Sequence, residues 1–271
     1  MKVILLTCLC LSAALALPGK SQLRPTIRTR DESNLLVVGG SDAIPHAHPY
    51  QVTLQYPGSN GYAHFCGGSI ISPNKVVTAG HCIDIGIPIT SLRVVAGDHD
   101  LSKNEGTEQV SFWKSAVSHP NFDLENIDWD YGVITVATNF TFNEYVQPVY
   151  LADKEIVPSG ICTATGWGYS TPDGNLPNIL QKIELPYVER TTCTDIYRSI
   201  AWGITERMIC AGGQRTKGVC DGDSGGALVC EGVRGTYLAG INSYVMPRCG
   251  ENEYPDGFAN VAFGRDWLLS N

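Results

Sequence analysis

Short segments in which apolar and polar residues alternate, separated by turn residues, are the feature that most restricts the fold of this chain. Residues 50–56 read Tyr-Gln-Val-Thr-Leu-Gln-Tyr, an alternation that is typical of a half-buried β-strand. Turn residues such as Pro57-Gly58 and Asp256-Gly257 interrupt the pattern, and helical periodicity is weak outside residues 191–199 and the C-terminus. Further short strands are expected at residues 93–96, 133–136, 183–188 and 237–241. The sequence therefore predicts an all-β fold.

The N-terminal segment differs in composition from the rest of the chain. Lys2 precedes an apolar run that ends in Ala14-Leu15-Ala16, the small-x-small pattern of a secretory signal peptide, so residues 1–16 are predicted to be removed on export. An uncleaved anchor is the alternative, but no later stretch approaches the about 20 apolar residues that a membrane-spanning helix needs. Residues 17–36 are rich in basic residues and have no apolar period, so they cannot bury a face. We expect the protein to be secreted.

Export changes the interpretation of the ten cysteines. Cys8 and Cys10 lie in the predicted signal peptide, which leaves an even number in the mature chain. In an oxidising compartment this number indicates four disulfide bonds, although the spacing alone does not choose the pairs. Zinc binding is the rival interpretation, but the chain has no Cys-x-x-Cys pair and the spacings are wide.

Three short segments carry residues that suit nucleophilic catalysis. Residues 222–226, Gly-Asp-Ser-Gly-Gly, place a serine between glycines, where the backbone can approach a substrate closely. A serine is a weak nucleophile unless a histidine acts as its base and a carboxylate orients that histidine. Residues 78–82, Thr-Ala-Gly-His-Cys, supply a histidine, and Asp130 opens an apolar segment, with Asp128 as a competing carboxylate. Each segment alone also has an ordinary structural interpretation, such as a turn, a packed histidine or a solvated aspartate.

Together with four further motifs, these segments resemble the chymotrypsin-like (trypsin-type) serine endopeptidase family. The motifs are Val-Val-Gly-Gly at 37–40, His-Phe-Cys-Gly-Gly-Ser at 64–69, Thr-Gly-Trp-Gly at 165–168 and Gly-Ile-Asn-Ser-Tyr at 240–244. The resemblance runs from Val37 to about Trp267. It implies two antiparallel six-stranded β-barrels, a short C-terminal helix and an active site in the cleft between the barrels. It divides the chain into an activation propeptide, 17–36, and a protease domain, 37–271, with the first barrel at about 37–150 and the second at about 151–271.

The resemblance implies a role for each residue of the catalytic motifs. His81 would be the general base, Asp130 the carboxylate that orients it and Ser224 the nucleophile. The backbone N–H groups of Gly222 and Ser224 would form the oxyanion hole, which stabilises the charge of the tetrahedral intermediate. Asp130 is preferred to Asp128 because the family has this aspartate immediately before the apolar strand.

An active enzyme is not the only function that the resemblance allows, because some relatives keep the fold as binding proteins after losing a triad residue. Here all three triad residues are present, which favours an endopeptidase, and labelling of Ser224 by a fluorophosphonate separates the two functions. Gly80 stands where the family usually has alanine, a change that is not expected to abolish activity. The resemblance also implies the disulfide pairs Cys66–Cys82, Cys162–Cys230, Cys193–Cys210 and Cys220–Cys249.

Four positions match the family's specificity pocket. Gly218 lies at the floor, where a trypsin-like enzyme would carry an aspartate, so strict Arg/Lys specificity is not expected. Ser243 and Val245 match one wall, and Val245 is expected to narrow the entrance as in elastase-like relatives. Asp256 matches another wall and resembles the crustacean collagenolytic proteases; it would meet water, bind a basic substrate side chain or point away. We expect a preference for medium apolar residues such as leucine, with some tolerance of basic ones, and the large aromatic pocket of chymotrypsin is the alternative.

Activation is expected to follow the family's zymogen scheme. Cleavage after Leu36 would free the α-ammonium group of Val37, which would pair with the buried carboxylate of Asp223. Most family zymogens carry arginine or lysine before the cleaved bond, and the nearest basic residue here is Arg30. The sequence therefore predicts activation by a leucine-accepting protease, with the enzyme itself as a candidate, after a first tryptic cut at Arg30.

The remaining expectations concern ligands and partners. Asp98, Glu105 and Glu108 stand where calcium-binding relatives carry carboxylates, so a structural calcium ion is a candidate, with an ion-free acidic loop as the alternative. No cofactor is expected to be required. Asn139 begins the sequon Asn-Phe-Thr and is a candidate glycosylation site. The net charge of −8 argues against a nucleic acid partner. Expected partners are protein or peptide substrates and protein protease inhibitors, with no membrane and a monomeric enzyme.

Overall fold

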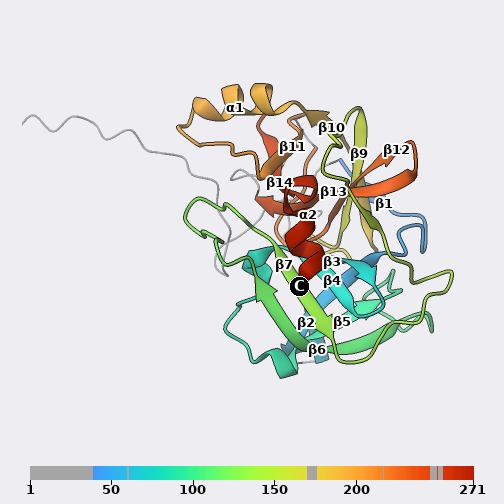
Figure 1. Cartoon of the computed structure of the whole chain (residues 1–271). Helices are drawn as coiled ribbons and strands as arrows, with labels where there is room; N and C mark the ends of the chain where they lie inside the picture. Colours follow the sequence, from blue (N-terminus) through green and yellow to red (C-terminus); the bar gives the residue numbers. More distant parts are fainter. Residues whose placement is uncertain (1–38, 60, 170–175, 216, 245–248, 250–252) are drawn as a thin grey trace, which may run out of the picture.

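The computed structural model describes residues 39–59, 61–169, 176–215, 217–244, 249 and 253–271 (Figure 1). The predicted signal peptide, the predicted propeptide with Leu36, and the positions Val37 and Val245 lie outside these residues. The described chain is mostly β-strand and has two α-helices, α1 (Arg190–Arg198) and α2 (Val261–Ser270). Both helices lie where the sequence retains helical periodicity. The predicted all-β class and the short C-terminal helix are confirmed.

Six antiparallel strands close the first barrel in the order β2-β3-β4-β7-β6-β5. The 3-10 turns η1 (Gly80–Cys82) and η2 (Ile89–Ser91) lie between β4 and β5. Because β4 pairs with β7, the turn that follows β4 is placed beside the segment that precedes β7. The strands are β2 (Gln51–Gly58), β3 (Gly61–Ser72), β4 (Lys75–Thr78), β5 (Arg93–Ala96), β6 (Gln109–Ser118) and β7 (Gly132–Val136).

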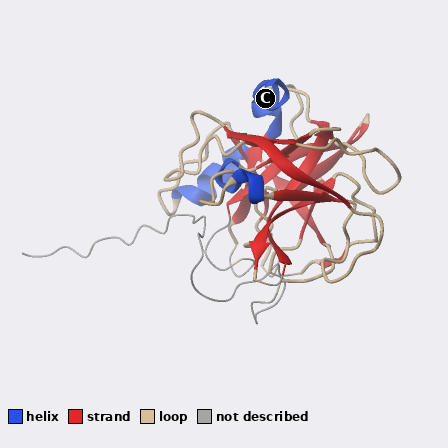
Figure 2. Cartoon of the chain, turned by 90° about the horizontal axis from the view of Figure 1, so that it is seen from below, coloured by secondary structure: helices blue, strands red, loops and turns tan. Residues whose placement is uncertain are grey.

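The second barrel closes because β9 pairs with both β10 and β12. Two short strands extend this sheet: β1 (Ser41–Asp42) pairs with β10, and β8 (Tyr150–Leu151) runs parallel to β13. Figure 1 shows the strands β9 to β14 above those of the first barrel, with α2 ending beside the first barrel, and in Figure 2 α2 lies at the edge of the molecule. The barrel strands are β9 (Ile161–Gly166), β10 (Gln181–Val188), β11 (Met208–Gly212), β12 (Ala227–Gly232), β13 (Gly235–Tyr244) and β14 (Pro255–Asn260).

Strand β2 forms where the alternating pattern predicts it, but the expectation of half-burial is wrong. The polar residues Gln51 and Thr53 are only 2% and 0% exposed. Gln51 Oε1 accepts a 2.7 Å hydrogen bond from the hydroxyl of Thr165 in β9, and Thr53 Oγ1 lies 2.7 Å from His64 Nδ1. Both faces of β2 are buried because one packs into its own barrel and the other meets polar partners, one of them in the second barrel.

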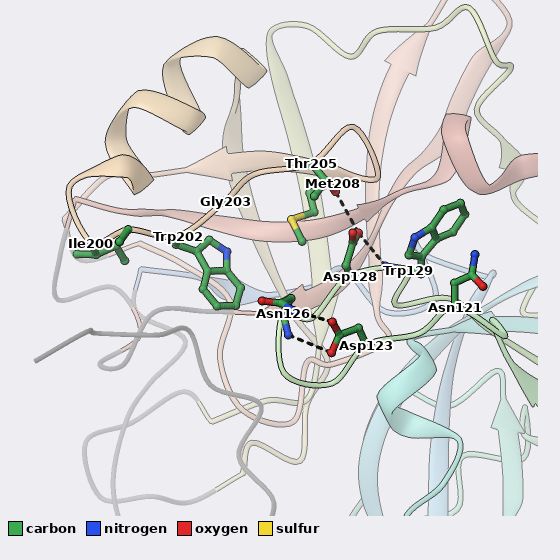
Figure 3. A pocket seen from close by; sticks show the side chains of 11 residues that line it. Asn121, Asp123, Asn126, Asp128, Trp129, Ile200, Trp202, Gly203, Thr205 and Met208 are labelled. Carbon is green, nitrogen blue, oxygen red and sulfur yellow. Dashed lines mark hydrogen bonds between the residues drawn. The ribbon is translucent and has the colours of Figure 1, made fainter.

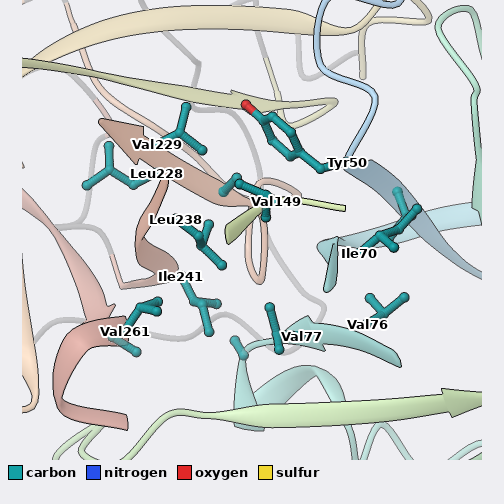
Figure 4. Close-up of a cluster of buried hydrophobic side chains, with 14 of the residues drawn as sticks. Tyr50, Ile70, Val76, Val77, Val149, Leu228, Val229, Leu238, Ile241 and Val261 are labelled. Atoms are coloured by element: carbon teal, nitrogen blue, oxygen red, sulfur yellow. The ribbon is translucent and has the colours of Figure 1, made fainter. Parts of the chain in front are cut away.

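One continuous apolar cluster joins the two barrels (Figure 4). Ile70 and Val77 of the first barrel belong to it together with Leu228, Leu238 and Ile241 of the second, and all five are nearly inaccessible to water. Apolar burial is the dominant favourable term in folding, at about 25 cal/mol per Å² of apolar surface. The shared core therefore fixes the two barrels against each other.

Four disulfide bonds reinforce the described chain, and they are the pairs that the resemblance implies. Cys66–Cys82 joins β3 to η1, and Cys162–Cys230 joins β9 to β12. Cys193–Cys210 and Cys220–Cys249 complete the set. Every cysteine after the predicted signal peptide is thus used, which leaves no thiolate for zinc. None of the helices in the described ranges has the length and apolarity needed to cross a membrane.

Candidate active site

The turn η1 and the segment that precedes β7 bring a histidine and a carboxylate together. His81 Nδ1 donates a 2.8 Å hydrogen bond to Asp130 Oδ2, and the backbone N–H of His81 donates a 2.9 Å bond to Asp130 Oδ1. The Asp130 carboxylate thus holds both the ring and the main chain of His81. Among the described residues, no group has hydrogen-bonding geometry to the buried His81 Nε2. This ring nitrogen is the one left to exchange a proton with a nucleophile.

A third donor to Asp130 comes from the second barrel. The hydroxyl of Ser243 in β13 donates a 2.6 Å hydrogen bond to Asp130 Oδ2, and the Asp130 residue is only 1% exposed. The sequence places Ser243 on the pocket wall but offers no signal for this contact, since the two residues lie 113 positions apart. A buried carboxylate is favourable only when such donors satisfy it.

Asp128, the competing carboxylate, has a different partner. Its oxygens accept bonds of 2.7–3.0 Å from Nε and Nη2 of Arg207, and the hydroxyl of Thr205 donates a further 3.0 Å bond. Burial alone would raise the pKa of Asp128, but the hydrogen bonds from Arg207 and Thr205 hold it below its ordinary value. Asp130, and not Asp128, is therefore the carboxylate that contacts His81.

The segment that carries Ser224 requires glycine at two positions. Gly222 and Gly225 have φ values of +94° and +77°, which L side chains rarely adopt. A Cβ on Gly225 would also lie 2.0 Å from Thr78 Oγ1. The carbonyl of Ser224 accepts a 2.8 Å bond from the N–H of Gly67, which ties this turn to the first barrel. These backbone angles and contacts explain why glycine stands on both sides of Ser224, at positions 222 and 225.

Asp223 points away from the surface and is 3% exposed. Its Oδ1 accepts a 2.8 Å bond from the N–H of Gly168, and its Oδ2 accepts a 2.9 Å bond from the N–H of Cys220. Burial raises the pKa of Asp223 to about 6, against the opposing effect of these backbone donors. The expected partner, the ammonium group of Val37, lies outside the described residues.

Asp256 lies in β14 and faces the floor of the expected pocket. Its Oδ2 accepts a 2.8 Å bond from the N–H of Val219, and a Cβ on Gly218 would lie 3.0 Å from the same oxygen. The residue is 5% exposed, so it is not a solvated loop aspartate. Burial raises the pKa of this carboxyl well above its ordinary value. Because Gly218 has no side chain, the carboxyl group of Asp256 fits at the expected pocket floor.

The acidic loop contains a compact set of oxygen atoms. One carboxylate oxygen from each of Asp98, Glu105 and Glu108 lies within 4.8 Å of the others. Asp98 Oδ1 is buried without a hydrogen-bond partner among the described residues. Burial, with the nearby carboxylates of Glu108 and Glu105, raises the pKa of Asp98 to about 7. Hard oxygen donors with an unsatisfied carboxylate fit calcium.

A cavity of about 450 Å³ lies beside the segment that leads to Asp130 (Figure 3). Asp128, Trp129 and Thr205 form part of its wall, and Trp202 and Gly203 of the second barrel also line it. Its other lining residues are Asn121, Asp123, Asn126, Ile200, Ala201 and Met208. The cavity thus adjoins the segment that leads to Asp130, and neither His81 nor Asp130 is among its lining residues.

Asn139, the expected glycosylation site, is exposed in the loop after β7.

Comparison with known proteins agrees with this geometry. The family model described as Trypsin matches residues 37–268. The chain is 38% identical over 239 residues to Trypsin-1 of Astacus astacus, covering 87% of this chain and 99% of that protein. It is 38% identical over 245 residues to human Chymotrypsin-like elastase family member 1, covering 88% and 92%, and 36% identical over 233 residues to Trypsin-10 of Gadus morhua, covering 86% and 89%. The chain therefore belongs to the trypsin family of chymotrypsin-like serine proteases and is a serine endopeptidase.

Proposed function

We propose that this endopeptidase works through a Ser224–His81–Asp130 triad and is secreted as a zymogen. The observation that carries the proposal is the buried contact of 2.8 Å between His81 Nδ1 and Asp130 Oδ2. A carboxylate at Nδ1 keeps the proton on that nitrogen, which leaves the lone pair of Nε2 to act as a base. The two barrels supply the two halves of this machinery, with His81 and Asp130 from the first and Ser224 from the second.

We infer the following reaction for the proposed triad. His81 Nε2 takes the proton of Ser224 Oγ as that oxygen attacks the peptide carbonyl, and the tetrahedral oxyanion is held by the N–H groups of Gly222 and Ser224. The imidazolium then gives its proton to the leaving amine, and the C–N bond breaks to leave an acyl-enzyme. Water repeats the sequence and releases the acid. Each oxyanion donor is worth about 2.7–4 kcal/mol of barrier in related sites.

The proposed function is tested by covalent labelling. After limited proteolysis, a fluorophosphonate should add one adduct to the protein, located at Ser224 by peptide mass spectrometry, and the labelled form should begin with Val37. Ser224→Ala, processed in the same way, is the matched control and should take no label. A processed wild-type chain that remains unlabelled would leave the binding-protein function standing, and a fully labelled form that begins at Asp31 would contradict cleavage after Leu36.

Asp223 supports the activation part of the proposal. Its carboxylate is buried beside the turn that holds Ser224, and its described partners are backbone N–H groups only. A free ammonium group at Val37 would supply the missing charge, since a buried carboxylate is costly without a cation. The leucine before Val37 then calls for a leucine-accepting protease, with this enzyme as one candidate.

The pocket favours medium apolar residues at the cleaved position. The floor at Gly218 carries no side chain, and burial of Asp256 favours its neutral carboxyl form, which an apolar side chain such as leucine tolerates. A lysine or arginine side chain would instead stabilise the ionised carboxylate, so basic residues are accepted as a second class. A large aromatic residue is the alternative occupant.

Asp256→Asn is expected to separate these two classes. The amide has nearly the same shape but cannot pair with a cation, so kcat/KM for substrates with arginine or lysine at the cleaved position should fall about 30-fold. For leucine substrates kcat/KM should stay within about twofold, since uniform apolar burial is unchanged. Cleavage profiles of a peptide library measure both, with the exposed Asp195→Asn as the control. A strict Arg/Lys preference in the wild type would contradict the proposed pocket.

Calcium is proposed to bind the Asp98, Glu105 and Glu108 carboxylates, and this predicts a pH-dependent stability. Without calcium, the folded chain binds a proton at Asp98 up to about pH 7, whereas the ordinary pKa is 3.8. Because the pKa of Asp98 is higher in the folded chain, this carboxyl contributes to the free energy of unfolding in full below the pKa of the unfolded chain. That contribution is lost as the pH rises toward 7. Added calcium should therefore raise Tm more at pH 8 than at pH 5. The control Asp98→Asn should lose most of this calcium effect. An equal rise in Tm in the wild type and the variant would show that calcium does not bind at Asp98.

The proposal extends to location and partners. The predicted signal peptide directs the chain to an oxidising compartment, which suits its four disulfide bonds. A protease of this family acts on protein substrates, and protein protease inhibitors that occupy the same cleft are proposed as partners of a monomeric enzyme. Exposure of Asn139 in the loop after β7 supports its proposed glycosylation.

A further inference from the structure

Two of the three residues immediately before Asp130 have an unusual backbone conformation. Ile127 and Trp129 have φ values of +52° and +57°, a region that β-branched and bulky side chains rarely adopt. Such conformations persist only when surrounding contacts impose them, and they gather at functional sites. Asp128 lies between the two and forms a pair of backbone hydrogen bonds with Asp123, which close the loop. The backbone of residues 127–129, which leads into Asp130, therefore adopts φ angles that its residues do not favour by themselves.

Contacts from the second barrel hold this path. The Ile127 side chain is 2% exposed and packs in an apolar cluster with Trp202 and Tyr244. The guanidinium carbon of Arg207 lies 4.9 Å from the centre of the Trp129 ring. Arg207 also binds Asp128 through a two-pronged contact at 2.7–3.0 Å, with both side chains partly buried. A planar guanidinium matches a carboxylate in this way, and a lysine does not.

Arg207 also contacts the other flank of Asp130. The hydroxyl of Tyr131 shares its one proton between two backbone carbonyls, that of Asn260 at 2.9 Å and that of Arg207 at 3.2 Å. Tyr131 is fully buried, so these donors and acceptors are shielded from water. Arg207 thus contacts Asp128 through its side chain, two positions before Asp130, and Tyr131 through its backbone carbonyl, one position after Asp130.

We propose that Arg207 is a positioning residue that clamps the Asp130 loop of the first barrel to the second barrel. The clamp sets where the Asp130 carboxylate meets His81, on its own barrel, and Ser243, on the other. Loss of the clamp lets the strained segment relax, which displaces Asp130 and weakens the orientation of His81. The inference rests on the proposed triad, because it acts through Asp130.

The test compares variants by kcat per active site, counted by fluorophosphonate titration. Arg207→Met keeps the length of the side chain and removes its donors, so kcat on a peptide amide should fall about tenfold, less than the about 100-fold of a full 1 Å displacement. KM should change less than twofold, because Arg207 has no place in the proposed pocket. Arg207→Lys should recover only part of the loss, because lysine restores the charge but not the planar pair of N–H donors.

Two further variants separate positioning from folding. Asp128→Asn removes the other half of the pair, and in the double variant the losses should not multiply, because the same contact is removed twice. The control Glu206→Gln changes an exposed charge 3.6 Å from Arg207 and should leave kcat unchanged. If Arg207→Met and Asp128→Asn lower Tm but keep the wild-type kcat per titrated site, the clamp is purely structural and the inference is wrong. A wild-type enzyme that takes no label would instead refute the proposed triad.

Discussion

Replacing His81 with alanine is expected to lower kcat by about a millionfold, because in a serine triad the loss of the base costs nearly as much as the loss of the whole unit. Without Nε2 there is no group to take the Ser224 proton as the C–O bond forms, and none to protonate the leaving amine. KM should change little, since the specificity pocket is formed by other residues. Steady-state kinetics on a peptide amide, with concentrated and repurified enzyme, measure the residual rate.

The matched control is the double variant His81→Ala/Ser224→Ala. Residues that act as one unit are not additive, so the double variant should be no slower than either single variant. A further loss in the double variant would mean that Ser224 and His81 contribute independently, which contradicts the proposed proton transfer between them.

Replacing Asp130 with asparagine is expected to lower kcat about ten-thousandfold, and the hydrogen bonds indicate why. Asp130 Oδ1 accepts from the backbone N–H of His81, a group that can only donate, so the amide oxygen must take that place. The amide NH2 group then occupies the Oδ2 position and faces His81 Nδ1. The ring must accept there and carry its proton on Nε2, which removes the base. Kinetics on a peptide amide at neutral pH check this result.

Asp128→Asn serves as the comparison for Asp130→Asn, because both variants remove one carboxylate from the same segment. Asp128 contacts Arg207 and Thr205 and has no bond to His81, so its loss should cost about tenfold, the scale expected for a modest displacement of the loop. Equal losses in the two variants would show that the segment as a whole, and not the tautomer of His81, decides the rate.

Several features of this protein follow from residues that are close in sequence. The alternation in residues 50–56 is enough to predict β2, because strand geometry repeats every two residues. The Gly-Asp-Ser-Gly-Gly segment identifies its serine, because the glycines are demanded by local backbone angles. The even number of cysteines after the predicted signal peptide indicates disulfide bonds. Fold class, the candidate nucleophile and the candidate base could all be predicted from such local patterns and from the resemblance that they support.

Other features depend on residues that meet only when the two barrels pack. Ser243 reaches Asp130 across 113 positions, and Arg207 reaches Asp128 across 79. The burial of Gln51 has the same origin, since its side chain meets Thr165 of β9 in the second barrel rather than water. No local pattern predicts such contacts, because the polarity of a side chain indicates what it can bind but not which distant residue the fold brings to it. Local patterns and the resemblance they support thus predict the fold class, the number of disulfide bonds and the candidate reactive residues, Asp130 among them. Contacts between distant segments set where Asp256 points and what holds Asp130, because those partners are brought together only by folding.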